Sequence, residues 1–250
     1  ARAGLRSLME WVDDAIVLGA RPFGEGKLVA EVFSREHGRY GGVVHAGRKS
    51  QPILQAGNLV HVGWKARLSE QLGFYSPLEL AEPHATRLLD DPIALAGLSS
   101  AVTLIRAATP ERQAYPQLYD AMIVLIEAMP HTDVWPALYT RFELGLLSAM
   151  GYGLDLTRCA VTGETEGLAW VSPRTGRAAT AEAGAPHADV LLRLPPFLVD
   201  PEAELSSGDV ADAFALAGYF LERRVFDQRG EGMPEQRRRL IERLGFAGRL

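Results

Sequence analysis

The sequence is poor in cysteine, in lysine and in long apolar runs. Cys159 is its one cysteine among 250 residues, which excludes an internal disulfide framework and leads us to expect a reducing, cytoplasmic setting. Lysine occurs three times, at Lys27, Lys49 and Lys65. No stretch of 18 uninterrupted apolar residues occurs, so we expect no transmembrane helix and no membrane partner.

The motifs of several enzyme classes are missing as well. The sequence contains no G-x-x-x-x-G-K-[ST] phosphate loop, no H-E-x-x-H and no G-x-S-x-G. The six histidines are scattered, and Cys159 has no histidine at metal-ligand spacing, so a buried, inert thiol is its favoured role. We therefore expect no enzyme and no cofactor.

One weak enzymatic pattern lies near the N-terminus. Asp13 or Asp14, followed by Glu25-Gly26-Lys27, resembles the acid-then-E-x-K arrangement of metal-dependent nucleases. There, carboxylates hold Mg²⁺ and the lysine steadies the attacking water. The pattern is short and lacks its usual α/β context, so a salt bridge beside the turn is the favoured interpretation.

The composition is that of an ordinary globular protein, with 47% apolar and 23% charged residues. Residues 1–8 precede Met9 and are interpreted as a leader or remnant outside the fold. Five apolar segments separated by glycine-rich turns then predict a small five-stranded barrel, at residues 11–19, 27–35, 38–47, 57–68 and 72–82. In the fourth, alternation predicts an apolar face of Val60, Val62, Trp64 and Ala66, and an outward face that carries Lys65 and Arg67.

After Pro83 the apolar spacing becomes helical. Helices are predicted at residues 86–108, 114–129, 134–150, 209–228 and 234–245, and residues 154–200 are expected to be irregular. The expected fold class is therefore α+β, with a barrel domain at 9–82 and a mainly helical domain at 83–250.

The net charge of −5 hides a local asymmetry. Residues 83–250 carry 16 basic and 22 acidic side chains, whereas residues 21–67 carry eight basic and three acidic ones, a balance of +5. A basic segment on an acidic protein is the footprint expected of a polyanion site, although a solvated sheet face explains it equally well.

A five-stranded barrel with outward cations is the plan of the OB-fold, which grips nucleic-acid backbones in a groove. We expect the DNA phosphates to contact Lys27, Arg35, Arg39, Arg48, Lys49 and Lys65. Aromatic side chains near the groove could stack bases, and the candidates are Phe23, Phe33, Tyr40, Trp64, Phe74 and Tyr75. Trp64 is expected in the core, which is also the favoured place for Phe33 and Tyr40.

A second basic cluster, Arg237-Arg238-Arg239, is expected to be solvated. Successive helical residues point about 100° apart, so the three cannot share one surface. A second DNA contact is the alternative.

Together these stretches resemble the RecO family of bacterial recombination mediators. The resemblance rests on Gly24-Glu25, Phe33-Ser34, Glu36-His37-Gly38 and Gly47-Arg48-Lys49-Ser50 in the family order, followed by LQAGNLVHVGW. In the helical region the clearest stretch is RFELGLLSAMGYGLDLTRCAVTG. The likeness covers nearly the whole chain after Met9, and it supports Arg48 and Lys49 as DNA contacts.

The resemblance implies an OB-fold followed by a helical domain, in a mediator of the RecF/RecO/RecR pathway. It implies binding to single- and double-stranded DNA, strand annealing, and partnership with RecR and with the acidic C-terminal tail of single-stranded DNA-binding protein. It also implies that the protein assists RecA indirectly, in the cytoplasm near the bacterial nucleoid.

One departure from the family concerns zinc. Many members hold zinc with two C-x-x-C pairs, but here the first pair reads Cys159-Ala160-Val161-Thr162 and the second falls at Thr180-Ala181-Glu182-Ala183. A closed structural zinc site needs four ligands, which one thiolate cannot supply. We therefore expect a degenerate, zinc-free version of the zinc-ribbon-like module at about 154–200.

A protein-interaction adaptor is the alternative function. In that case the helical domain holds a partner's peptide tail in an apolar pocket with a basic rim, and DNA is reached mainly through partners. The candidates for this rim are Arg106, Arg112 and Arg141.

Overall fold

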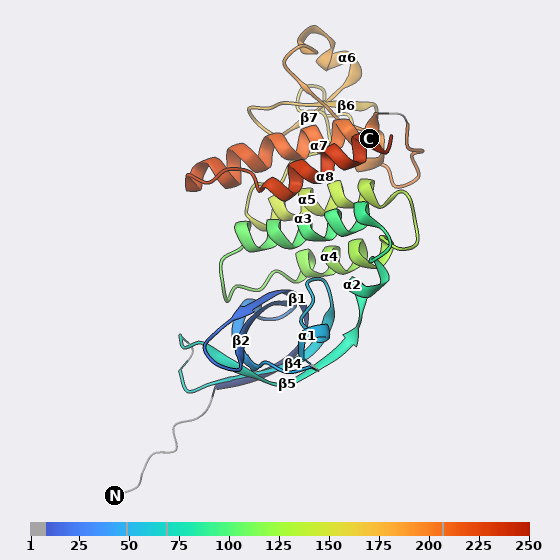
Figure 1. Cartoon of the computed structure of the whole chain (residues 1–250). Helices are drawn as coiled ribbons and strands as arrows, with labels where there is room; N and C mark the ends of the chain where they lie inside the picture. Colours follow the sequence, from blue (N-terminus) through green and yellow to red (C-terminus); the bar gives the residue numbers. More distant parts are fainter. Residues whose placement is uncertain (1–8, 49, 69, 207) are drawn as a thin grey trace, which may run out of the picture. The chain divides into compact units, whose positions relative to one another are not determined.

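The structure is a computed structural model that describes residues 9–48, 50–68, 70–206 and 208–250. The chain folds into two compact units, Ala1–Pro130 and His131–Leu250 (Figure 1). The expected division into residues 9–82 and 83–250 stays a prediction.

The first unit begins with five strands, as the apolar segments predicted. They are β1 (Met9–Pro22), β2 (Lys27–Ser34), β3 (Gly38–His45), β4 (Leu59–Ala66) and β5 (Gly73–Glu82), with the short helix α1 (Ser50–Ile53) before β4. Neighbours follow the order β1-β2-β3-β5-β4, and β4 also pairs with β1, so the strands form a barrel (Figure 1). All these pairs are antiparallel except β3 with β5.

The interior of this barrel is apolar because side chains alternate along each strand. On β4 the predicted face is confirmed, since Val60, Val62, Trp64 and Ala66 are all buried. They pack with Ala15 and Val17 of β1, Ala30 and Val32 of β2, and Tyr75 of β5. The outward faces of the strands are therefore left for charged residues.

The parallel contact between β3 and β5 is built on two glycines. Its register places Gly42 opposite Gly73, and Val43 opposite Phe74. A Cβ atom on Gly42 would lie 2.6 Å from the ring of Tyr75, and one on Gly73 would lie 2.5 Å from the carbonyl oxygen of Lys65. The two strands can approach because neither position carries a side chain.

Three helices complete the first unit. They are α2 (His84–Arg87), α3 (Pro92–Ala108) and α4 (Pro116–Ala128). The single helix expected at 86–108 is thus interrupted before Pro92, because a residue preceding proline avoids the helical conformation. Asp91 adopts an extended conformation and caps α3, accepting hydrogen bonds from the N–H groups of Ile93 and Ala94 at 2.9 Å.

Helices α3 and α4 pack against the barrel. Phe33 of β2 is fully buried, and its ring lies 6.0 Å from that of Tyr119 on α4. Gly57, just before β4, lies against Leu98 of α3, where a Cβ atom would come within 2.5 Å of the leucine side chain.

The second unit is mainly helical. Its long elements are α5 (Trp135–Ala149), α7 (Asp209–Phe220), the π-helical continuation of α7 (Leu221–Phe226) and α8 (Glu235–Phe246). Residues 154–200 are more regular than expected, since β6 (Leu168–Val171), β7 (Ala178–Thr180) and β8 (Leu192–Arg193) form a small sheet in the order β7-β6-β8, with α6 (Ala181–Gly184) after β7. Across the described residues, no helix has the length and apolarity needed to span a membrane.

The expectation that the Arg237-Arg238-Arg239 cluster is solvated is wrong for Arg237. This side chain is 7% exposed, and it donates from Nε and Nη2 to the two carboxylate oxygens of Glu143 on α5, at 2.6 and 2.9 Å. Nη2 also donates to the carbonyl of Phe214 on α7, at 2.8 Å. Burial raises the pKa of Glu143, and Arg237 opposes that rise with its charge and hydrogen bonds. One guanidinium therefore joins α5, α7 and α8.

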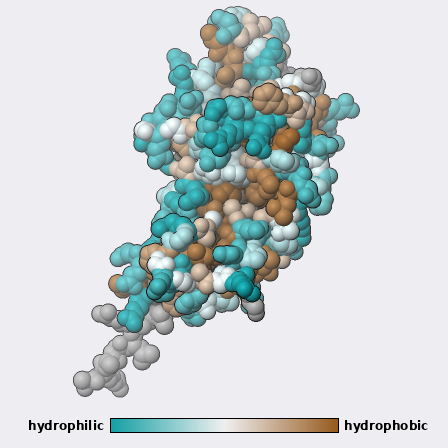
Figure 2. All heavy atoms as spheres, viewed as in Figure 1, coloured by the Kyte–Doolittle hydropathy of each residue, from teal (hydrophilic) through white to brown (hydrophobic). Residues whose placement is uncertain are grey.

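The other two arginines of the cluster are exposed. Arg238 pairs with Glu235 and Glu242, and Arg239 pairs with Glu235. Figure 2 shows a hydrophilic patch where Figure 1 draws α8.

Replacing Arg237 with Met is expected to lower the free energy of unfolding by about 3–5 kcal/mol, because it leaves a buried carboxylate without its partner. The double variant Glu143→Leu/Arg237→Met is expected to recover most of that loss. Urea unfolding measures both, and Arg238→Met is the matched control that should leave the midpoint nearly unchanged. A single variant as stable as the control would contradict this account of the pair.

Candidate nucleic-acid interface

The predicted phosphate contacts divide into exposed and ion-paired side chains. Lys27 begins β2 and Arg48 lies between β3 and α1, and both are exposed. Lys65 points outward from β4, with its Nζ 3.4 Å from Glu10 of β1. Lys49 lies outside the described residues. Two further arginines of the basic segment are exposed: Arg21 near the end of β1, and Arg67, which directly follows β4 and was predicted on its outward face.

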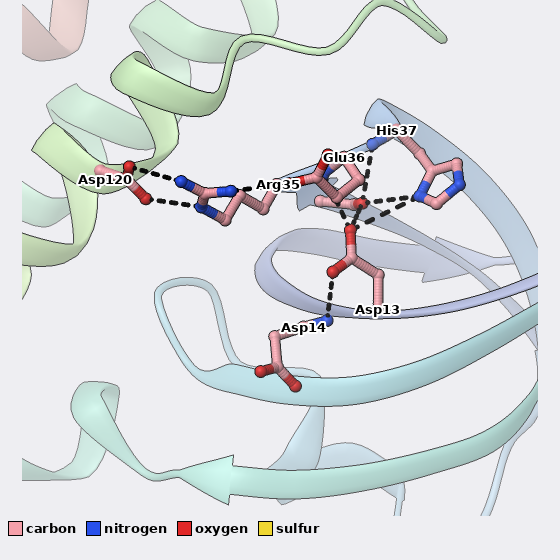
Figure 3. A network of polar contacts seen from close by, with 7 residues as sticks. Asp13, Asp14, Arg35, Glu36, His37 and Asp120 are labelled. Atoms are coloured by element: carbon pink, nitrogen blue, oxygen red, sulfur yellow. Dashed lines mark hydrogen bonds and ion pairs between the residues drawn. The ribbon is translucent and has the colours of Figure 1, made fainter.

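Asp13 of β1 stabilises the turn between β2 and β3 through hydrogen bonds (Figure 3). Asp13 Oδ2 accepts hydrogen bonds from the Ser34 hydroxyl and from the backbone N–H of Glu36, the latter at 2.9 Å. The Nδ1 atom of His37 lies 3.5 Å from the same oxygen, and the His37 ring stacks on Trp11 with 4.2 Å between centroids. The carboxylate of Asp13 therefore has a structural role in this turn.

Arg35 extends from that turn to helix α4 (Figure 3). It donates from Nε and Nη2 to the two oxygens of Asp120, at 2.9 and 3.0 Å, and from Nη1 to Glu36 at 2.7 Å. The hydrogen bonds from Arg35 lower the pKa of Asp120. A DNA phosphate would have to compete with two carboxylates for this guanidinium.

The nuclease-like pattern is not assembled. Ala15 pairs with Ser34, so Asp13 lies beyond the C-terminal end of β2, whereas Lys27 begins that strand. Seven residue steps at about 3.3 Å each separate Lys27 from Ser34 by roughly 23 Å. Asp14 instead pairs with His61 at 2.9 Å. Asp13 and Asp14 therefore lie at the opposite end of β2 from Glu25 and Lys27.

Arg39 is even more enclosed. It pairs with Glu31, donates to the carbonyl of Thr109 at 3.2 Å and lies 3.7 Å from Glu111. The second carboxylate oxygen of Glu31 accepts from Arg106 of α3, at 2.9 Å. Glu31 therefore joins a predicted DNA contact to a predicted partner contact.

These groups line a cavity of about 570 Å³, here called the arginine cavity. Its charged lining consists of Arg21, Arg39, Arg106, Arg112, Glu31, Glu70 and Glu111. Arg112 has a φ of +63°, which is rare for a residue other than glycine. Its backbone N–H donates to Arg39 O at 2.8 Å, and its guanidinium lies 5.3 Å from the centre of the Tyr40 ring. Four arginines against three glutamates leave this cavity weakly cationic.

A second hollow opens where β3 and β5 diverge, and we call it the Phe74 cleft. Its volume is about 500 Å³, and Leu72 lines both hollows. The other residues that line it are Lys27, Val43, Val44, His45, Gly73, Phe74, Tyr75 and Ser76. On the barrel part of the face drawn in Figure 2, hydrophilic and apolar residues alternate in small patches.

The structure also separates the stacking candidates. Trp64 and Phe33 are core residues, as favoured, and Trp64 donates from Nε1 to the carbonyl of Gly41 at 3.1 Å. Tyr75 is buried with its hydroxyl on the carbonyl of Tyr40, and Tyr40 is half-buried. Phe23 and Phe74 are the candidates left exposed.

The three predicted partner contacts do not share one cavity. Arg106 and Arg112 both line the arginine cavity of the first unit. Arg141 belongs to the second unit, where it donates to the carbonyl of Phe197 and lies 6.0 Å from the centre of that residue's ring.

In the zinc-ribbon-like module, two of the other three ligand positions, Thr162 and Thr180, contact the sulfur of Cys159. Cys159 is buried, and its Sγ accepts from the N–H groups of Thr162 and Thr180 at 3.4 Å. These hydrogen bonds, those from Thr162 first, lower the pKa of Cys159 to about 6. The Thr180 hydroxyl accepts from the N–H of Ala183 at 3.3 Å and so caps α6. One thiolate, two threonines and an alanine do not fit a zinc ion.

The described residues also contain no group of three or more His, Cys, Asp or Glu side chains placed to hold a metal.

The fold and its surface define a protein with an OB-like barrel, exposed cations and a helical second unit. Comparison with known families agrees. Residues 9–84 match the model "Recombination protein O N terminal", and residues 89–231 match "Recombination protein O C terminal". The chain belongs to the RecO family.

Individual relatives match over nearly their whole length. The chain is 47% identical over 239 residues to "DNA repair protein RecO" of Hyphomonas neptunium, which covers 94% of this chain and 98% of the relative. It is 47% identical to the protein of the same name from Phenylobacterium zucineum, over 97% of this chain and all of the relative. The identity to the Rhodospirillum centenum protein is 48%, over 94% of each.

Elemental analysis of the purified protein is expected to find far less than one zinc per chain, because the module offers one thiolate. The triple variant Thr162→Cys/Thr180→Cys/Ala183→Cys supplies four thiolates, and Thr162 and Thr180 already contact the Cys159 sulfur, so this variant should bind about one equivalent. One zinc per chain in the unaltered protein would contradict this prediction.

Proposed function

We propose that this chain is a DNA-binding mediator of recombinational DNA repair that holds DNA phosphates on its N-terminal barrel. The observation that carries the proposal is a set of exposed cations on the barrel, Arg21, Lys27, Arg48 and Arg67, which have no ion-pair partner among the described residues. Family membership supports the same role, since the relatives from Hyphomonas, Phenylobacterium and Rhodospirillum are named DNA repair proteins.

The predicted contacts are expected to contribute unequally. Lys27 and Arg48 can meet a phosphate without first giving up a carboxylate, and Lys49 is proposed beside Arg48 from the sequence. Lys65, Arg35 and Arg39 already pair with carboxylates, so each exchanges one anion for another and gains less. The binding energy then comes largely from counterions released by the first group.

Annealing follows from the same physics. A protein that neutralises two strands at once reduces their mutual repulsion and lets complementary bases meet. From the family we further propose that the chain binds RecR and the acidic tail of single-stranded DNA-binding protein, and that it assists RecA loading in the cytoplasm. No chemical step is needed for any of these roles.

The adaptor function remains the second candidate, favoured by the arginine cavity. Arg106 and Arg112 lie together there, beside the exposed side chain of Leu72. A cavity with guanidinium groups beside an apolar side chain suits an acidic peptide with an apolar residue.

Replacing Arg48 and Lys49 with Ala is expected to weaken binding to every DNA sequence alike. The slope of log affinity against log salt should flatten by about 1.4, at roughly 0.7 for each single-strand phosphate that is no longer neutralised. Fluorescence anisotropy of a labelled single-stranded oligonucleotide, titrated at several salt concentrations, measures both quantities.

The matched control is Arg238→Ala/Arg239→Ala, which removes the same charge from exposed, ion-paired positions on α8. It should bind DNA like the unaltered protein. If the unaltered protein does not bind even at low salt, DNA is reached through partners and the adaptor function is the better account.

Replacing Asp120 with Asn is expected to tighten DNA binding and steepen its salt dependence. The change removes the carboxylate that takes two of the Arg35 hydrogen bonds, so the guanidinium becomes available to a phosphate. Asp155→Asn is the control, since it removes one partly exposed, ion-paired carboxylate from the second unit. Equal affinity for the two variants would mean that Arg35 does not reach DNA.

A further inference from the structure

The Phe74 cleft combines an exposed aromatic ring with cations. Phe74 is 47% exposed, while Gly73 and Tyr75 on either side of it are buried. The strand alternation therefore turns the ring outward, away from the barrel core. A single exposed apolar side chain is common on protein surfaces, so the ring alone indicates nothing.

The shape of the cleft comes from the short pairing of β3 with β5. These strands pair at Gly42 with Gly73 and at Val43 with Phe74. Beyond this point, Val44 and His45 of β3 and Tyr75 and Ser76 of β5 line the opening. The volume of about 500 Å³ lies within the range of roughly 300–1,000 Å³ that small-molecule sites occupy. The ring of Phe74 thus stands beside a hollow of the right size for a nucleotide.

The charge around the cleft favours an anion. Lys27 and His45 lie opposite each other on β2 and β3 and both line the cleft. Lys65, the cross-strand neighbour of Phe74 on β4, lies 3.4 Å from Glu10, whereas the exposed Arg48 follows His45 by three residues. The described residues that line the cleft include no carboxylate.

We propose that Phe74 is a stacking platform for an unpaired base of single-stranded DNA, with Lys27 and the neighbouring cations on the flanking phosphates. Any base presents a π-face to an aromatic ring, so this contact is independent of sequence. In a duplex the bases already stack on one another, and the ring has no free base to receive. The proposal rests on the proposed function and deepens it, because it gives the barrel a means to distinguish single from double strands.

The test compares three labelled ligands of equal length: oligo-dT, an abasic strand and a duplex. Phe74→Ala is expected to weaken binding to oligo-dT by about 5- to 150-fold, the range measured for removal of one stacked base. Binding to the abasic strand and to the duplex should not change. The salt slope should also stay the same, because the same cations still neutralise the phosphates.

Two further replacements separate stacking from bulk. Phe74→Tyr keeps the ring and is expected to bind oligo-dT like the unaltered protein, whereas Phe74→Leu keeps the apolar volume and should behave like Phe74→Ala. Phe246→Ala is the matched control, since Phe246 is 93% exposed in the second unit. Phe74→Trp provides a direct signal, because oligo-dT should quench its fluorescence beyond that of the unaltered protein and the duplex should not.

The possible failures are distinguishable. If the unaltered protein binds oligo-dT with steep salt dependence and Phe74→Ala binds equally well, stacking is wrong and the proposed function stands. Equal losses on all three ligands would show that Phe74 supports the barrel, and would also overturn the proposal. No binding of any ligand by the unaltered protein would overturn both proposals together.

Discussion

The close approach of β3 to β5 is the constraint on which the barrel depends. It requires the absence of side chains at Gly42 and Gly73, where Tyr75 and the Lys65 backbone occupy the space a Cβ would need. Because the pairing is limited to the two residues on each strand, the strands then separate and leave the Phe74 cleft. The same geometry that shapes the core therefore also creates this cleft on the outer face.

The number of basic residues in the barrel does not show how many of them can contact a phosphate. The segment 21–67 carries a balance of +5 in sequence, but its cations differ in what they can offer a ligand. Arg35 is held by Asp120 and Glu36, and Arg39 is held by Glu31, while Lys27 and Arg48 stay exposed. Electrostatic attraction depends on all of these charges, whereas a short-range phosphate contact depends on the few that are unpaired.

Much of the architecture could be predicted from the sequence, because local patterns determine it. The alternation of Val60, Val62 and Trp64 fixed the inner face of β4, and the RecO family was evident from the glycine and arginine motifs. Long-range pairings could not be predicted. Asp120 lies 85 residues from Arg35, and Glu143 lies 94 residues from Arg237. The sequence also could not tell which of the neighbouring residues Phe74 and Tyr75 faces the core. The register of the strand in the barrel decides this, and it buries Tyr75 and exposes Phe74.

The buried pair of Glu143 and Arg237 has a consequence for how this family can change over time. Either residue alone is unfavourable in that apolar setting, and each is acceptable while the other is present. A lineage that loses one must pass through a destabilised form before it can lose the other. The two positions are therefore expected to be exchanged together among RecO sequences, as a correlated pair, although they are far apart in the chain.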